Sequence, residues 1–224
     1  MTFRAETRMI DGGLEIVRLI SNEIKIVIPS QIGGVPVVSL GAMFLRDSHG
    51  PGNRTLIIPA TVTSASDEAL VSTVIKTINY LGSFETFNSF KWSLGNDCQV
   101  ICGDGFIFNF LSGYSMCFPD FDNEILTSHQ RISEATVMAR LKDPFMLTEE
   151  NREKYVHYMR SRTVPMAEHA ILENDNATLK SIIETKLLSE DDLKELLESS
   201  LRSGRTSSTS MIMSTLNAMN SGRQ

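Results

Sequence analysis

The side chains that most often do chemistry in proteins are few in this chain, and their spacing matches no common catalytic or metal-binding pattern. The four histidines are His49, His129, His157 and His169. No His-x-x-x-His or Cys-x-x-Cys pair occurs, so the usual zinc spacings are missing. Phosphate-binding glycine motifs and the Gly-x-Ser-x-Gly nucleophile elbow are absent as well. The sequence therefore predicts no catalytic residues, no metal site, no cofactor and no enzymatic activity.

The three cysteines are Cys98, Cys102 and Cys117, and they cannot all pair with one another. Cys98 and Cys102 lie four residues apart in an expected strand, which separates their α-carbons by roughly 13 Å, too far for a disulfide. We interpret Cys98 as a turn residue and Cys102 as a core thiol, with a redox pair as the alternative. Cys117 is expected to be buried, because free cysteine usually behaves as a small hydrophobe.

Three carboxylates lie close together in the segment Asp120-Phe-Asp-Asn-Glu124. The segment resembles the start of a calcium-binding loop, but the glycine and the distal glutamate of such a loop are not in place. We therefore interpret it as a solvated acidic loop. An enzyme with a site between the two halves of the chain would instead have a pocket lined by His129, Cys117, Asp120 or Asp122, and no motif supports that alternative.

Composition excludes several broad classes of protein. The 224 residues are 42% hydrophobic, which is enough apolar material for a core, and the formal net charge is -6. A chain with no basic surplus is not expected to bind nucleic acid. The chain contains no run of eighteen apolar residues, so a membrane span is not expected, and no signal peptide is visible. We therefore expect a cytoplasmic protein, or a cell-surface protein if a leader has been removed.

Two halves of different character indicate an α+β protein. Residues 1–110 contain short β-branched runs such as Ile24–Ile28 and Leu56–Ile58, which favour strands. Residues 111–127 show neither the alternation typical of strands nor the spacing typical of helices, and we interpret them as a connector. Residues 128–224 are rich in helix formers. One helical face is indicated there by the spacing of Leu193, Leu196, Leu197 and Leu201.

The first half repeats itself. An apolar strand motif begins at Ile26, Leu56, Ile78 and Val100, with intervals of 30, 22 and 22 residues. The longer first interval is explained by a turn-rich insertion around residues 47–53. A period in the low twenties indicates a solenoid with one short strand per coil, whose apolar faces are buried by stacking.

Alternation along each strand predicts which side chains face the core of the solenoid and which face outward. The inward positions are Ile26, Ile28, Leu56, Ile58, Ile78, Tyr80, Val100 and Cys102. The outward positions are Lys25, Val27, Thr55, Ile57, Thr77, Asn79, Gln99 and Ile101. The outward row of Val27, Ile57, Asn79 and Ile101 is mostly apolar, so we predict that this face binds a partner. Alternatively, the connector or the first C-terminal helix covers it, and the row is an inter-domain core.

The phrases IVIPSQIGGVPVVSLGAMFL and LIIPATVTSASDEAL carry a resemblance to a known family. They resemble the BspA-like leucine-rich repeats of bacteria, in which an apolar strand ends in Ile-Pro and a Val-x-Ser-Ile-Gly turn follows. The second copy departs from this pattern at Ala65-Ser66, where Ile-Gly would be expected. It departs again at Leu70, where the family usually has phenylalanine. Residues 78–88 resemble the family's terminal variant, and residues 96–105 resemble its closing strand and Asp-Gly turn. The resemblance covers about residues 12–108 and implies a leucine-rich-repeat domain over residues 1–110.

Cap residues and prolines predict the helices of the second half. Pro144 ends a helix over residues 132–141, Pro165 starts another, and Gly204 ends a helix. The expected N-caps are Thr148, Asp175 or Asn176, and Ser189. Residues 170–183 and 199–212 each resemble an ankyrin helix-turn-helix, with Asp175 aligned to Gly204. The Thr-Pro-Leu-His signature of ankyrin repeats is absent, so residues 165–219 are described as ankyrin-like.

Both resemblances imply binding rather than catalysis. We expect a non-enzymatic protein–protein interaction module with an unknown protein partner. The alternative is a bacterial cell-surface adhesion or host-contact protein, which would need an export signal. The sequence leaves the oligomeric state open.

Overall fold

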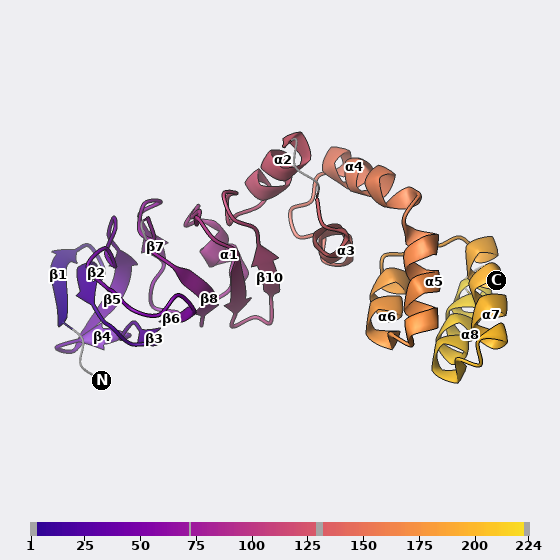
Figure 1. Cartoon of the computed structure of the whole chain (residues 1–224). Helices are drawn as coiled ribbons and strands as arrows, with labels where there is room; N and C mark the ends of the chain where they lie inside the picture. The colour runs from indigo at the N-terminus through magenta and orange to yellow at the C-terminus, as the bar shows by residue number, and fades with distance from the viewer. Residues whose placement is uncertain (1–3, 72, 129–131, 222–224) are drawn as a thin grey trace. The chain divides into compact units, whose positions relative to one another are not determined.

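The computed structural model describes residues 4–71, 73–128 and 132–221 (Figure 1). This part of the chain is mixed α/β, with strands β1–β10 followed by most of its eight helices. The chain divides into two compact units: unit 1 comprises Met1–Ser128 and unit 2 comprises His129–Gln224. The order of strands first and helices second agrees with the coarse architecture expected from composition. Among the described residues, no helix has both the length and the apolar character needed to cross a membrane.

Unit 1 contains two five-stranded sheets. The first has the order β1-β2-β5-β4, with β7 paired to β5, and the second has the order β10-β9-β8-β6-β3. The strands of the first sheet are β1 (Arg4–Ile10), β2 (Gly13–Ile20), β4 (Gln31–Ile32), β5 (Val35–Leu40) and β7 (Ser64–Ala65). Those of the second are β3 (Lys25–Val27), β6 (Arg54–Ile58), β8 (Ile75–Tyr80), β9 (Cys98–Cys102) and β10 (Ile107–Phe110).

The second sheet is solenoid-like. Strands β3, β6, β8 and β9 are parallel, and the register aligns Ile26 with Leu56, Leu56 with Ile78, and Ile78 with Val100. These are the repeat positions expected from the sequence, which confirms the alignment of the coils. All eight predicted inward side chains are at most 4% exposed. Stacking one short strand per coil therefore buries the apolar face that no single coil could bury alone.

An aromatic cluster fills the β10 end of this sheet. Helix α1 (Phe84–Asn88) contributes Phe84 and Phe87, both buried. The sole tryptophan, Trp92, is 1% exposed, and its ring lies 5.5 Å from that of Phe87. Its indole N–H donates to the Ser66 carbonyl at 2.9 Å. Buried rings therefore continue the aliphatic core of the coils toward the end of the unit.

Unit 1 also contains residues 111–127, for which the sequence predicts a connector without regular structure. Helix α2 (Asp120–Thr127) forms there, and its Phe121 ring packs against the rings of Phe108 and Phe110. The ring centroids lie 5.4 and 5.3 Å apart, respectively. Phe121 and Ile125 are buried and lie four residues apart, one helical turn. A two-turn helix is too short for this spacing to stand out as a period in the sequence.

The buried Arg54 holds the chain beside the insertion around residues 47–53. Its side chain enters the unit at the start of β6 and is 3% exposed. The guanidinium donates to the backbone carbonyls of Ser21 at 2.6 Å, Ser48 at 3.0 Å and Glu23 at 3.2 Å. Burial lowers the pKa of Arg54 from its usual value. One side chain thus joins two loop segments to the first residue of a core strand.

Unit 2 consists of helices. They are α3 (Glu134–Lys142), α4 (Glu149–Arg160), α5 (Thr163–Glu173), α6 (Asn176–Glu184), α7 (Glu190–Arg202) and α8 (Thr206–Ser221). The predicted N-caps Thr148 and Ser189 are confirmed, because each side chain accepts a first-turn backbone N–H. Of the two candidates for α6, Asp175 is the N-cap and Asn176 is the first residue of the helix. Helix α5 begins before Pro165, not at it. Proline is tolerated there because first-turn N–H groups have no partner within the helix.

The turns that follow α5 and α7 are alike. Asn174 has φ +59° after α5 and Gly204 has φ +65° after α7, and both are left-handed residues that end a helix. The sequence alignment of Asp175 with Gly204 is therefore wrong by one residue, because Asn174 takes the left-handed position. The prediction for α7 also needs correction: Leu193 and Leu196 are buried, whereas Leu201 is 61% exposed.

Position 201 turns away from the core because eight residues overshoot two helical turns. Ser200, seven residues after Leu193, is buried in its place. The core of unit 2 is made of Ala167, Ala170, Ile171, Leu179, Ile182, Leu188, Leu193, Leu196 and Ile212. Helices α5, α6, α7 and α8 all contribute to it, so the two helix pairs share one core.

Candidate functional site

The outward side of the second sheet carries two continuous rows of side chains. The register pairs Val27 with Ile57, Ile57 with Asn79, and Asn79 with Ile101. It likewise places the other outward positions in one row, in the order Lys25, Thr55, Thr77 and Gln99. The structure thus brings all eight predicted site residues onto one surface. We call this surface the outward face.

Side chains of the outward face reach solvent. Lys25 is exposed, and the other seven are partly exposed. Each alternates along its strand with an inward side chain that is fully buried, as the pleat of a strand requires. Helix α2, part of the segment that could have covered the face, packs its Phe121 against the inward rings of Phe108 and Phe110 instead.

Strand β10 extends both rows by one residue, which the sequence prediction missed. It runs antiparallel to β9 and pairs Ile107 with Ile101 and Asn109 with Gln99. Ile107 is 59% exposed. The alternation of Ile107-Phe108-Asn109-Phe110 after the Asp104-Gly105 turn was the signal that could have identified this strand. The outward face therefore spans all five strands of the sheet.

The outward face combines an apolar row with a polar row that is mostly uncharged. One row presents Val27, Ile57, Asn79, Ile101 and Ile107, and the other presents Lys25, Thr55, Thr77, Gln99 and Asn109. Hydroxyl and amide side chains donate and accept hydrogen bonds without carrying charge. Neighbouring strands lie about 4.8 Å apart, so each row is a narrow strip roughly 20 Å long. Such a strip offers van der Waals contact and hydrogen bonds.

The acidic segment predicted as a solvated loop is helical, so that prediction is wrong. Glu124 accepts from the backbone N–H of Ser115 at 2.7 Å and from its hydroxyl at 2.6 Å. Asp122 is fully buried, and Asp120 accepts from the thiol of Cys117 at 3.4 Å. Over the described ranges, no cluster of three or more His, Cys, Asp or Glu side chains could hold a metal ion. His129, the fourth residue named for a pocket between the halves, lies outside the described residues.

All three cysteines are buried and free. Cys98 is the first residue of β9 and not a turn residue, whereas Cys102 and Cys117 are buried as expected. Burial raises the pKa of each of the three thiols to about 12. The thiols are therefore protonated near neutral pH and poor nucleophiles.

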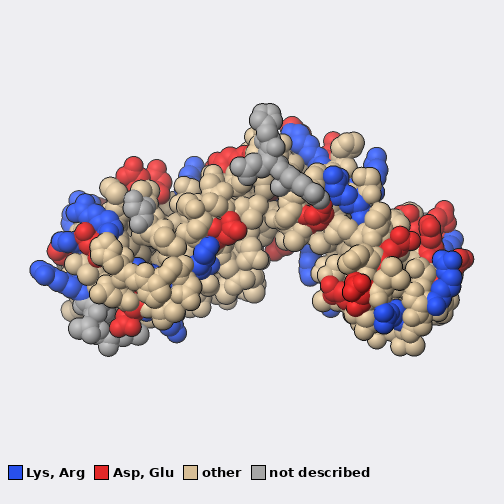
Figure 2. All heavy atoms as spheres, in the orientation of Figure 1, with Lys and Arg blue, Asp and Glu red and all other residues tan. Residues whose placement is uncertain are grey.

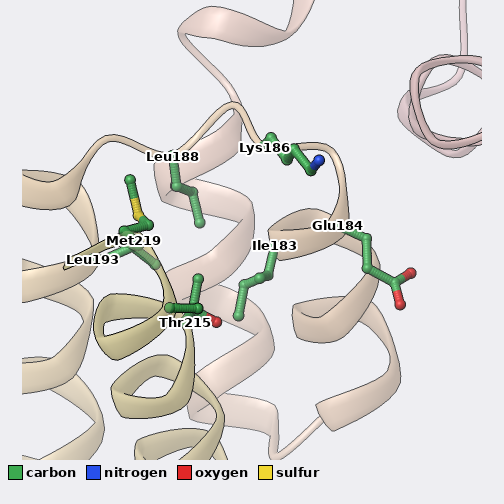
Figure 3. A pocket seen from close by; sticks show the side chains of 8 residues that line it. Ile183, Glu184, Lys186, Leu188, Leu193, Thr215 and Met219 are labelled. Atoms are coloured by element: carbon green, nitrogen blue, oxygen red, sulfur yellow. The ribbon is translucent and has the colours of Figure 1, made fainter. Parts of the chain in front are cut away.

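A cavity of about 520 Å³ lies in unit 2, and nothing in the sequence pattern predicted it. It is lined by Ile183, Glu184, Lys186, Leu188, Leu193, Thr215, Ala218 and Met219. Figure 3 shows the side chains of Ile183, Leu188 and Met219 turned toward the same space, whereas the Glu184 carboxylate points away from it. That carboxylate pairs with Lys142 on α3 at 2.6 Å. The lining of the cavity is therefore mainly apolar, with Thr215 and Lys186 as its other polar members.

Comparisons of the chain with models of protein families, with curated proteins and with solved structures found no match. The resemblance to BspA-like leucine-rich repeats and to ankyrin-like helices therefore stays a prediction from the sequence. What the structure itself defines is a mixed α/β protein with a β-solenoid-like region followed by helices.

Proposed function

We propose that this chain is a non-enzymatic protein–protein interaction module that binds a polypeptide through the outward face. The single observation that supports the proposal is the pair of rows across β3, β6, β8, β9 and β10. In this proposal, unit 1 is a solenoid of the leucine-rich-repeat type and unit 2 is an ankyrin-like helical module. Repeat proteins of both kinds offer extended surfaces to protein partners.

The apolar row supplies the affinity in this proposal. Aliphatic side chains that stay in contact with water favour a partner that covers them, and contiguous apolar surface often marks an interface. Lys25 is the one charged residue among the ten positions of the outward face. Because ion pairs contribute little to such an interface, binding is expected to change only slightly with salt concentration.

Affinity capture from the source cells, with matched variants, tests the proposal. The test variant carries Ile57→Asp, Ile101→Asp and Ile107→Asp, which put three charges into the apolar row. The matched control is Val71→Asp, an exposed aliphatic position of unit 1 outside the outward face (Val71 is 42% exposed). Each variant is first shown to fold by the fluorescence of the buried Trp92.

The proposal expects a captured protein that the control retains and the triple variant loses. A partner that binds all variants alike would place the site elsewhere. If the triple variant unfolds while the Val71→Asp control does not, the outward face is a core surface and the proposal fails.

A further inference from the structure

The edge strand β1 has unusual surroundings. It pairs with β2 along one side, and no other strand of the described part of the chain pairs with its second side. Figure 1 shows β1 as the outermost strand of its sheet. Five of its seven residues are exposed, including Thr7 and Met9, so neither of its faces is covered. An unpaired edge of this length offers free backbone N–H and C=O groups to another strand, and the β-bulge in the β1–β2 pairing lies on β2, where Val17 is the extra residue.

Charges on β1 form sign-alternating pairs with β2. Glu6 lies opposite Arg18 and Arg8 lies opposite Glu15. The Arg18–Glu6 pair measures 3.2 Å and the Arg8–Glu15 pair 2.5 Å. On the free side, Glu6 and Arg8 therefore present one negative and one positive group, two residues apart. Figure 2 shows basic and acidic side chains interspersed at the end of unit 1 that carries β1.

We propose that β1 pairs antiparallel with β1 of a second copy of this chain, about a two-fold axis at Thr7. Thr7 then faces Thr7 of the second copy, and Glu6 faces its Arg8 in both directions. Four charged side chains then lie side by side across the joined sheets: Arg18 and Glu6 of one copy, followed by Arg8 and Glu15 of the second copy. Each of these charges is next to a charge of opposite sign. Opposite charges on facing strands are stabilising, and like charges are destabilising.

The same charges disfavour the registers centred on a charged residue, and a register centred on Ala5 would match Glu6 with Arg4 but pair only residues 4–6. Centring the pairing on Glu6 would oppose the two Glu6 side chains and would also place Arg4 against Arg8. Centring it on Arg8 would oppose two Arg8 side chains, and an in-register parallel pairing would oppose like charges throughout. The Thr7 register is the one that matches both charges and pairs all seven residues of the strand.

The opposite face of β1 gives an independent reason for the same register. Ala5, Thr7 and Met9 continue the inner rows of β2, whose residues Leu19, Ile16 and Leu14 are buried. Met9 is 66% exposed because no strand lies beyond it. The Thr7 register places Ala5 of the second copy beside Met9, which removes apolar surface from water. Charge and apolar contact thus favour one and the same pairing.

Mixing two charge variants of the full chain tests the proposal by sedimentation velocity. Paired seven-residue edges make a small interface, so we expect dimer formation over about 1 to 500 µM, the range of weak association. Arg8→Glu and Glu6→Arg each put like charges across the axis and should weaken dimerisation at least about tenfold. Arg4→Glu makes the same charge change as Arg8→Glu, but on a residue facing Ile10 of the second copy, and should keep the dimer.

The mixture of Arg8→Glu with Glu6→Arg is the decisive sample. In a mixed pair, one chain carries acidic side chains at positions 6 and 8 and the other carries basic side chains at both. Opposite charges then face each other across the axis, so dimerisation should return. Damage to the pairs with Glu15 and Arg18 within each chain is the same alone or mixed, and cannot explain a rescue. A protein that is monomeric throughout, a dimer indifferent to both variants, or a mixture without rescue would each overturn the proposal.

Cysteine cross-linking checks the register even if a charge variant fails to fold. Facing residues of antiparallel strands have α-carbons about 4.5–5.5 Å apart, within the range for a disulfide. Thr7→Cys should therefore form a covalent dimer on mild oxidation. Ala5→Cys, the matched control, faces Met9 and should not. The three native cysteines are buried and do not compete. Equal cross-linking of both variants, or none with Thr7→Cys, would contradict the register.

Discussion

Replacing Arg54 with methionine is expected to destabilise unit 1 strongly. Methionine keeps much of the length and apolar contact of the arginine stem but cannot donate a hydrogen bond. The change therefore leaves the carbonyls of Ser21, Glu23 and Ser48 without the guanidinium that they accept from at 2.6, 3.2 and 3.0 Å. The control is Arg54→Lys, which retains the charge but reaches fewer acceptors from a single point.

The expected loss of stability depends on how deeply each of the three hydrogen bonds of Arg54 is buried. The bond to Ser21 is buried, and a hydrogen bond from a charged donor contributes about 1.5–3 kcal/mol. The other two bonds are part-buried, so water replaces much of each, and about 0.5–1 kcal/mol is lost per bond. We expect Arg54→Met to cost about 2.5–5 kcal/mol and Arg54→Lys about half as much. A typical domain has only about 5–15 kcal/mol of stability.

Urea unfolding followed by two probes isolates the effect. Trp92 is the sole tryptophan and is buried in unit 1, so its fluorescence reports that unit. Circular dichroism at a helical wavelength reports mainly the helices of unit 2. The fluorescence midpoint of Arg54→Met should fall while the helical transition changes little. A loss below about 1 kcal/mol at Trp92 would refute the reasoning, because the carbonyls would then not depend on the guanidinium.

Three further predictions concern stability. Gly103→Ala should cost about 1–3 kcal/mol at Trp92, because an added Cβ would lie 2.3 Å from the Leu81 carbonyl oxygen, whereas Gly95→Ala meets nothing within 4 Å and should be neutral. Ser189→Ala should lower the stability of unit 2 by about 1 kcal/mol in thermal unfolding, since it removes a capping box; no change would show that α7 does not need it. The raised pKa of the three cysteines, to about 12 in the folded chain, predicts that their contribution to stability is constant below about pH 8.5, that the free energy of unfolding falls as pH rises from about 8.5 toward 12, and that it falls less in a triple Cys→Ala variant.

The strand register could be predicted because the sequence repeats. When equivalent residues recur at a fixed interval, stacking the coils places each beside its counterpart, and Val27, Ile57, Asn79 and Ile101 fell into one row. Helix starts were predictable for a local reason. A cap such as Ser189 satisfies backbone N–H groups within its own first turn, so distant residues do not decide its position.

Features that depend on distant contacts were not predictable. Helix α2 forms where Phe121 meets Phe108 and Phe110, thirteen and eleven residues earlier in the chain. Asp122 is buried in this helix, although the composition of the segment suggested exposure to solvent. The cavity in unit 2 is bounded by three helices and a loop, and its volume is set by how they pack.

The hairpin of β1 and β2 shows why edge strands escape hydrophobic patterning. Alternation reveals a strand when one face is buried, but in β1 both faces meet water, and its residues alternate in charge instead. The local signal that remained was the Asp11-Gly12 turn, typical of hairpins. The proposed dimer contact rests on the alternating charges of Glu6 and Arg8. That alternation can be recognised only once their pairing with Arg18 and Glu15 is known. A surface selected to meet another chain is therefore patterned to complement that chain, and hydrophobic periodicity along its own sequence does not reveal it.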